Sequence, residues 1–246
     1  FRTLFAFQPW HSLIEFRRYL LRFIHQLHNI ENLSCLMVAP YNQYESIILP
    51  LLKWLKEKGV EFENNSLVYD IDFKKIEGQR VVEKILYLKK GVETQIKVND
   101  DDFVFVTNGS MTSASSCGSM TQKPKEQPPS STTRWCLWNN ISRKSLLFGR
   151  PEVFNNRVDE SKWESFTITF KNSLFFDLME KFTKNKSGTG IGTTIKSSNW
   201  VLTLVLPNQP HFRNQPEGVY VCWGYALFVD EKGNYHAEAF GINYDR

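Results

Sequence analysis

The sequence lacks the features that mark several common classes of protein. It has no run approaching the roughly 18–20 apolar residues of a membrane span. No apolar stretch follows a basic start, as it would in a signal peptide. The balance of 30 lysines and arginines against 26 acidic residues gives a charge of only +4, without a basic stripe or an arginine cluster. We therefore expect a cytoplasmic protein with no nucleic-acid partner.

Patterns typical of metal and redox sites are lacking too. No two cysteines have CxxC spacing, and a chain of this size needs no disulfides, so we expect free thiols and no zinc site. The cysteines are Cys35, Cys117, Cys136 and Cys222. His25 and His28 share one face of an expected helix, but no third ligand lies nearby. Polar residues at a helix end are the favoured interpretation, and no metal is predicted.

No familiar catalytic pattern is present either. The sequence contains no G-x-S-x-G, no H-E-x-x-H, no EF-hand loop and no Ser/His/Asp arrangement with assignable roles. The run Gly188-Thr189-Gly190-Ile191-Gly192 is similar to a phosphate-binding loop but lacks its lysine and the following Ser or Thr. We interpret this run as a flexible turn. Residue patterns alone indicate a mixed α/β chain and leave ligand binding open.

The composition is that of a folded protein. The chain has 246 residues, 41% hydrophobic and 23% charged, enough for one large domain or two small ones. Aromatic residues reach 14%, with 19 Phe, 9 Tyr and 7 Trp. This high aromatic content is typical of a protein with a large apolar cavity, and it is equally typical of a densely packed core.

Helical periodicity dominates the first part of the chain. Residues 11–28 and 46–58 each place apolar side chains on one face, which predicts two amphipathic helices with buried stripes. Ser46 is a candidate N-cap of the second helix, and Gly59 stands where a C-cap glycine is expected. The connector PYNQYES between them is polar and aromatic, and a surface turn is its simplest interpretation.

After Gly59 the period changes from 3.6 to 2. Strands are expected at 60–62, 67–73, 81–88 and 94–98, with a hairpin turn at residues 89–91. The apolar run 103–106 predicts a strand buried on both faces, ending in the turn Thr107-Asn108-Gly109-Ser110. This order is typical of the second half of a dinucleotide-binding domain, where ligands sit beyond the carboxyl ends of strands. An ordinary Asn-Gly turn is the simpler alternative.

The remainder mixes a loop, helices and strands. Residues 110–133 are rich in Ser, Thr, Pro and Lys and predict a long loop, followed by a helix that begins near Arg134. Strands are expected at 164–170, 199–206 and 219–228, and an amphipathic helix at 174–184. The last two strands are joined by a polar, proline-rich connector that contains His211.

Ordered sequence blocks then point to a family. They include FAFQPWHSLIEFRRYLLRFIH, PYNQYESIILPLLKWLKEKGV, VYDIDF, DDFVFVTNGSMT, RWCLWNNI, ESKWESFTITF, PNQPHF and QPEGVYVCWGYALF. Over essentially its whole length the chain closely resembles the oleate hydratase family, also called myosin-cross-reactive antigen proteins. The resemblance implies an FAD-dependent lyase. It would add water to a cis double bond of a free unsaturated fatty acid such as oleate or linoleate, giving a hydroxy fatty acid without net redox change at the flavin.

The resemblance also implies a fold. Family members combine a Rossmann-type FAD-binding domain with a substrate domain, a mixed α+β architecture. This chain lacks the G-x-G-x-x-G of the N-terminal βαβ unit and starts at Phe1 rather than Met, so we expect a middle segment of a longer protein. Residues 1–59 are expected on the substrate side, 60–120 in the second half of the FAD domain, and 121–246 in the substrate-binding region.

Site residues follow from the matching blocks. The flavin set is Val68, Asn108, Gly109 and Ser110. The fatty acid set is Gln43, Asn208 and His211. Simpler structural interpretations stay open, with Val68 in a core, Ser110 as a turn hydroxyl and His211 on the surface. In the family's pattern, a glycine pair usually stands at Ile191-Gly192, which places a changed turn near the pocket.

No catalytic residue is assigned within the chain. The family's water-activating glutamate is expected upstream, and its proton-donating tyrosine just before Phe1. The resemblance further implies peripheral membrane association and a homodimer. An alternative stays open, in which the chain is a truncated, non-catalytic remnant that binds FAD or a fatty acid.

Overall fold

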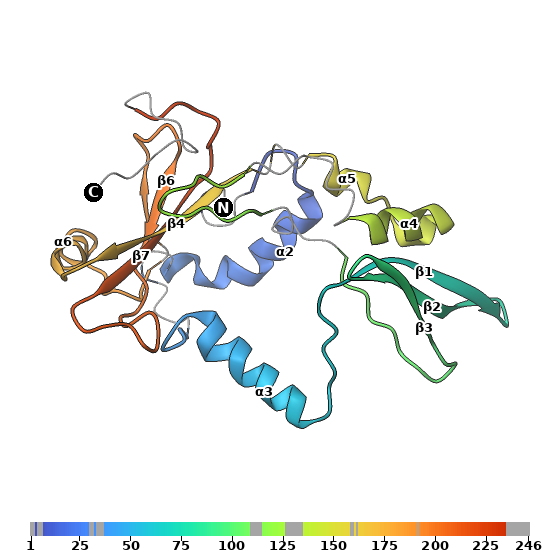
Figure 1. Cartoon of the computed structure of the whole chain (residues 1–246). Helices are drawn as coiled ribbons and strands as arrows, with labels where there is room; N and C mark the ends of the chain where they lie inside the picture. The colour runs from blue at the N-terminus through green and yellow to red at the C-terminus, as the bar shows by residue number, and fades with distance from the viewer. Residues whose placement is uncertain are drawn as a thin grey trace. The chain divides into compact units, whose positions relative to one another are not determined.

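The chain forms two compact units, seen in a computed structural model (Figure 1). The structure describes Thr3, Asn32, Glu160 and residues 7–29, 37–108, 115–125, 135–157, 162–190 and 192–234. The first unit is drawn from Phe1–Val60 and Lys162–Ile242, and the second mainly from Glu61–Ser161. Helices and strands are both present and both sheets are antiparallel, so the expected mixed α/β class is confirmed.

The second unit is built on a three-stranded meander. Its strands are β1 (Ser66–Ile76), β2 (Gln79–Lys89) and β3 (Val92–Lys97), in the order β1-β2-β3. The expected hairpin turn between β2 and β3 is confirmed. Lys90 and Gly91 both have positive φ, 51° and 84°, as a tight hairpin turn of the primed type requires. Three short helices follow, α4 (Cys136–Lys144), η4 (Leu146–Phe148) and α5 (Glu152–Asn155).

Polar side chains of α4 fasten this helix to β1. Asn140 Nδ2 donates to the Tyr69 carbonyl at 2.8 Å. Lys144 Nζ donates to Asp70 Oδ2 at 2.8 Å, to the Ile71 carbonyl at 2.7 Å and to Asp72 Oδ1 at 2.8 Å. The bond from Lys144 holds the pKa of the Asp72 carboxyl below its ordinary value, against an opposing effect of burial. The ionised form of Asp72 therefore contributes stability that is lost as the pH falls through this lowered pKa.

The first unit contains a four-stranded sheet. Its strands are β4 (Glu164–Phe170), β5 (Thr193–Ile195), β6 (Leu202–Val205) and β7 (Tyr220–Ala226), in the order β4-β7-β6-β5. The expected strand at 164–170 and the helix at 174–184 are confirmed, the latter as α6 (Leu174–Thr183). Central β7 carries most of the core, including the fully buried Cys222, and burial raises the pKa of that thiol to about 11.

Both expected N-terminal helices are present, with different ends. Residues 11–28 form α2 (Leu13–Phe23) and the 3₁₀ segment η1 (Ile24–Asn29). The second helix begins earlier than predicted, as the π-helical η2 (Tyr44–Ile48), and continues as α3 (Leu49–Glu57). Gly59 ends it as expected, with φ of 81° and a bond from the Val60 N–H to the Leu55 carbonyl. Ser46 is not the N-cap, because it lies inside η2 and its hydroxyl bonds the Tyr41 backbone.

Two expectations about burial are wrong. The apolar stripes of α2 and α3 are not buried, since neither helix contains a buried residue and Leu13 is 78% exposed. Residues 103–106 form no strand, and Phe103 and Phe105 are 88% and 92% exposed. Within the described residues the sheet of the second unit ends at β3, which pairs only with β2. Residues 103–106 therefore do not extend this sheet as a further strand. Residues 60–62 likewise form no strand.

The functional division into residues 1–59, 60–120 and 121–246 stays a prediction.

No helix within the described ranges combines the length and apolar character needed to cross a bilayer.

Replacing Lys144 should weaken the second unit selectively. The substitution Lys144→Met leaves Asp70 and Asp72 without their shared cation and removes the bond to the Ile71 carbonyl. Because the three groups are partly exposed, we expect a loss of about 1–2 kcal/mol of unfolding free energy. Lys75→Met is the matched control, since Lys75 is exposed on β1, the strand that carries Asp70 and Asp72. Denaturant-dependent hydrogen exchange at β1 amides measures both, and equal effects would contradict the assignment.

Candidate functional site

The structure joins two of the sequence blocks that carry the predicted fatty acid set. The Asn42 N–H donates to the His211 carbonyl at 2.9 Å, and Asn42 Nδ2 donates to the same oxygen at 3.1 Å. These residues are 169 positions apart. The connector between α2 and α3 therefore lies against the connector between β6 and β7. Gln43 follows Asn42 directly at the start of η2, and its side chain is exposed.

Asn208 lies at the same junction. Its Nδ2 donates to the Ala39 carbonyl at 3.4 Å. Its side chain also lies directly over Gly188, where an added Cβ would stand 1.7 Å from Asn208 Oδ1. Gly188 has φ of 83°, and its N–H donates to the Leu206 carbonyl at 2.7 Å. This bond holds the glycine-rich turn against the end of β6. Because Gly188 has no Cβ, the turn leaves room for the side-chain amide of Asn208.

Two glutamines hold the connector that carries Asn208 and His211. Gln209 uses both ends of its amide on β7, donating to the Val221 carbonyl at 2.9 Å and accepting from the Val221 N–H at 3.1 Å. Gln215 Nε2 donates to Gln209 Oε1 at 2.8 Å, and Gln215 Oε1 accepts from the His211 N–H at 2.8 Å. Gln209 and Gln215 therefore fix the connector both to β7 and internally.

His211 is partly buried, and its environment favours the neutral ring. Burial lowers the pKa of His211, and the nearby Glu45 carboxylate partly opposes that shift. The ring lies 5.0 Å from the ring of Phe212, edge to face. A neutral imidazole in this position can donate one hydrogen bond and accept another. An anionic ligand bound beside the ring would raise this pKa.

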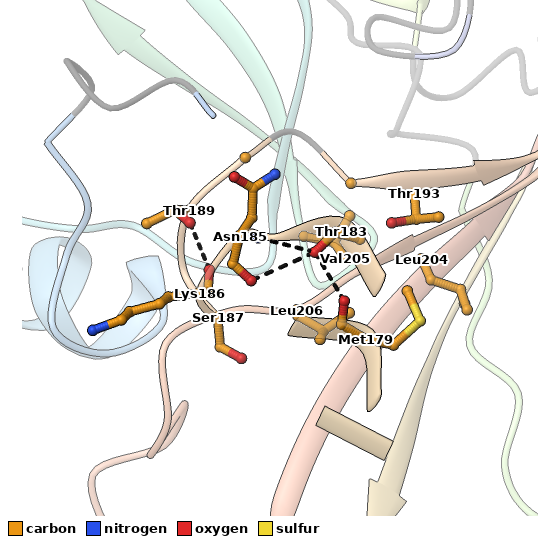
Figure 2. A pocket seen from close by; sticks show the side chains of 12 residues that line it. Met179, Thr183, Asn185, Lys186, Ser187, Thr189, Thr193, Leu204, Val205 and Leu206 are labelled. Carbon is orange, nitrogen blue, oxygen red and sulfur yellow. Dashed lines mark hydrogen bonds between the residues drawn. The ribbon is translucent and has the colours of Figure 1, made fainter. Parts of the chain in front are cut away.

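A small pocket lies beside the glycine-rich turn (Figure 2). It has a volume of about 90 Å³. Its lining comes from the end of α6, the glycine-rich turn, β5 and β6: Met179, Thr183, Asn185, Lys186, Ser187, Thr189, Gly190, Gly192, Thr193, Leu204, Val205 and Leu206.

The polar groups of this turn are used within the chain. Glu180 Oε1 accepts from the Ser187 N–H at 2.8 Å and from Ser187 Oγ at 2.6 Å, which holds the pKa of Glu180 below its ordinary value. Thr189 Oγ1 donates to the Lys186 carbonyl at 2.6 Å. This arrangement stabilises a turn rather than presenting donors to a phosphate.

The structure describes only two residues of the predicted flavin set, Val68 and Asn108. Val68 lies on β1, partly buried, and its carbonyl contacts Cys136 Sγ at 4.0 Å. Asn108 is exposed. Gly109 and Ser110 lie outside the described residues, so the four residues are not seen together.

The described residues contain no group of three or more side chains placed to hold a metal ion. His25 and His28 lie on η1, where His28 Nε2 is 3.0 Å from Asn29 Nδ2.

Comparisons with known proteins define the class. A model of the MCRA family matches residues 1–239, and the chain belongs to this family, as the resemblance predicted. The chain is 35% identical over 239 residues to the oleate hydratase of Streptococcus pyogenes serotype M49 (strain NZ131), covering 95% of this chain and 40% of that one. It is 31% identical over 245 residues to the linoleate hydratase of Lactiplantibacillus plantarum, covering 95% and 43%. The chain thus spans less than half the length of these relatives.

Sequence reasoning missed the residues that hold the site together. Asn42, Glu45, Gln209 and Gln215 were not assigned roles, although each joins segments of the junction. The spacing Asn42-x-x-Glu45 before an apolar run is a helix-start signal, and Asn42 Oδ1 indeed accepts from the Glu45 N–H at 3.0 Å. Nothing in the sequence pattern pairs Gln209 with β7.

Substituting Gly188 should disturb the junction. In Gly188→Ala the new Cβ would overlap the Asn208 side chain, in addition to the strain of a positive φ. Gly218→Ala is the matched control, because Gly218 has φ of 75° with nothing within 4 Å of the added atom. We expect Gly188→Ala to lower the unfolding free energy by about 1–3 kcal/mol more than the control. Denaturant unfolding measures the difference, and similar losses would show that Asn208 moves freely.

Proposed function

We propose that the chain is part of an FAD-dependent fatty acid hydratase and that it supplies the site for the substrate's carboxylate. Support comes from the family and from relatives named as oleate and linoleate hydratases. The observation that carries the proposal is the contact of Asn42 with His211, which brings two of the predicted substrate blocks to one place. The substrate would be a free unsaturated fatty acid, and the product a hydroxy fatty acid.

Each member of the fatty acid set has suitable chemistry. Gln43 is exposed and its amide can donate to a carboxylate oxygen. His211 can donate through a ring N–H and strengthen that bond by taking up a proton. Asn208 is held by Ala39 and by the glycine turn, so it would bind without further ordering. The acyl chain would gain about 0.8 kcal/mol for each CH₂ removed from water.

The FAD part of the proposal rests on the second unit, which we propose belongs to a Rossmann-type flavoprotein fold. Val68, which lies partly buried on β1, would meet the adenine end of the cofactor. Asn108, Gly109 and Ser110 would meet the cofactor from the segment that follows residue 106. When bound, FAD would organise and polarise the site without net redox change.

The groups that activate water and protonate the alkene are not assigned to this chain. Peripheral membrane association and a homodimer belong to the same proposal and rest on the resemblance alone.

Product analysis tests the proposal. The chain, supplied with FAD, is incubated with oleic acid, with the Streptococcus pyogenes oleate hydratase as positive control. A chimera of that relative, in which this chain replaces the matching segment, is tested in parallel. We expect a product heavier by one water from the chimera, detected by mass spectrometry, and loss of that product in a His211→Ala chimera. A chimera that binds FAD and folds but yields no product would favour the non-catalytic remnant.

Oleate binding should weaken as the pH rises. His211 has a pKa below its ordinary value of 6.5, and a bound carboxylate would raise that pKa, so binding takes up a proton. The contribution of His211 is then fully present below the lowered pKa of the free ring and is lost as the pH rises through the raised pKa of the bound ring. Oleate dissociation constants for the wild type and His211→Gln, measured across these two pKa values, should converge at high pH. A constant ratio would contradict a carboxylate beside His211.

A further inference from the structure

One carboxylate oxygen connects the two halves of the junction. Glu45 Oε2 accepts from Asn42 Nδ2 at 2.6 Å and from the Arg213 N–H at 2.9 Å. Both donors adjoin His211, because Asn42 donates to its carbonyl and Arg213 lies two positions after it. We call these two bonds to Glu45 Oε2 the Glu45 clamp.

Further contacts fix the groups on each side of the clamp. On the helix side, Asn42 Oδ1 accepts from the Glu45 N–H at 3.0 Å, so Asn42 and Glu45 hold each other across the first turn of η2. On the connector side, the guanidinium of Arg213 lies 5.6 Å from the centre of the Tyr41 ring. The segment 41–45 thus holds residues 211–213 through two backbone groups and one ring contact.

We propose that Glu45 is a positioning residue for the carboxylate site, acting through the backbone around His211. This inference rests on the proposed function, because it assigns a role in the same site. Glu45 would not bind the fatty acid's carboxylate, because two carboxylates repel each other and its Oε2 already accepts from two donors. Its contribution is to order residues 211–213 before the ligand arrives, which lowers the cost of binding.

The chemistry of the oxygen distinguishes three variants. In Glu45→Ala both hydrogen bonds of the clamp are lost. In Glu45→Gln the amide oxygen can still accept from Asn42 and Arg213, so the geometry survives while the charge is removed. In Glu57→Gln an exposed carboxylate at the end of α3 is replaced, which makes this variant the matched control.

The first measurement needs no ligand. Amide hydrogen exchange at Arg213 should be faster in Glu45→Ala by roughly ten- to hundredfold, because one charge-assisted hydrogen bond is lost. It should stay close to wild type in Glu45→Gln and in Glu57→Gln. Titration of the His211 ring by NMR should show a lower pKa in both Glu45 variants, because each removes the nearby negative charge. Unchanged exchange at Arg213 in Glu45→Ala would overturn the clamp.

The second measurement uses oleate below its micelle concentration. We expect the dissociation constant to rise by roughly five- to tenfold in Glu45→Ala and by less in Glu45→Gln. Combined with His211→Ala, Glu45→Ala should add little, because a residue that acts through His211 has nothing left to position. Full additivity would overturn the positioning role. If the wild type binds no oleate, the proposed function fails, and the exchange and titration results still decide the clamp.

Discussion

The bond between Asn42 and the His211 carbonyl is the constraint on which the rest of the site depends. It joins residues 169 positions apart and brings a helix start against the connector between two strands. The predicted fatty acid set, Gln43, Asn208 and His211, lies within a few residues of this contact. The four-stranded sheet supplies the fixed frame, since Gln209 attaches the connector to Val221 of β7. The site is therefore a property of two connectors and not of a helix or strand.

This construction explains which parts were predictable from the sequence. Periodicity identified β4, α6 and the three strands of the meander, because each alternates or repeats over enough residues to be distinctive. The turn at Lys90-Gly91 and the end at Gly59 followed from glycine's freedom at positive φ. Local chemistry decides these features, so local sequence reveals them.

The failures have a common physical cause. The stripes of α2 and α3 and the run 103–106 were expected to be buried, but burial depends on a partner surface that a local pattern cannot specify. The same holds for the site. The family resemblance selected Gln43, Asn208 and His211, yet the side chains that hold them, Asn42 and Gln209, act through backbone groups of distant residues.

The contacts at the junction are asymmetric in a way that bears on how the protein can change. The donors are amide side chains, and the acceptors are mostly backbone carbonyls, those of Ala39, His211 and Val221. A carbonyl is present whatever residue stands at its position. Sequence drift at the accepting positions therefore leaves the geometry intact, whereas drift at Asn42 or Gln209 removes it. Such a junction would tolerate substitution at Ala39 or Val221 better than at Asn42 or Gln209.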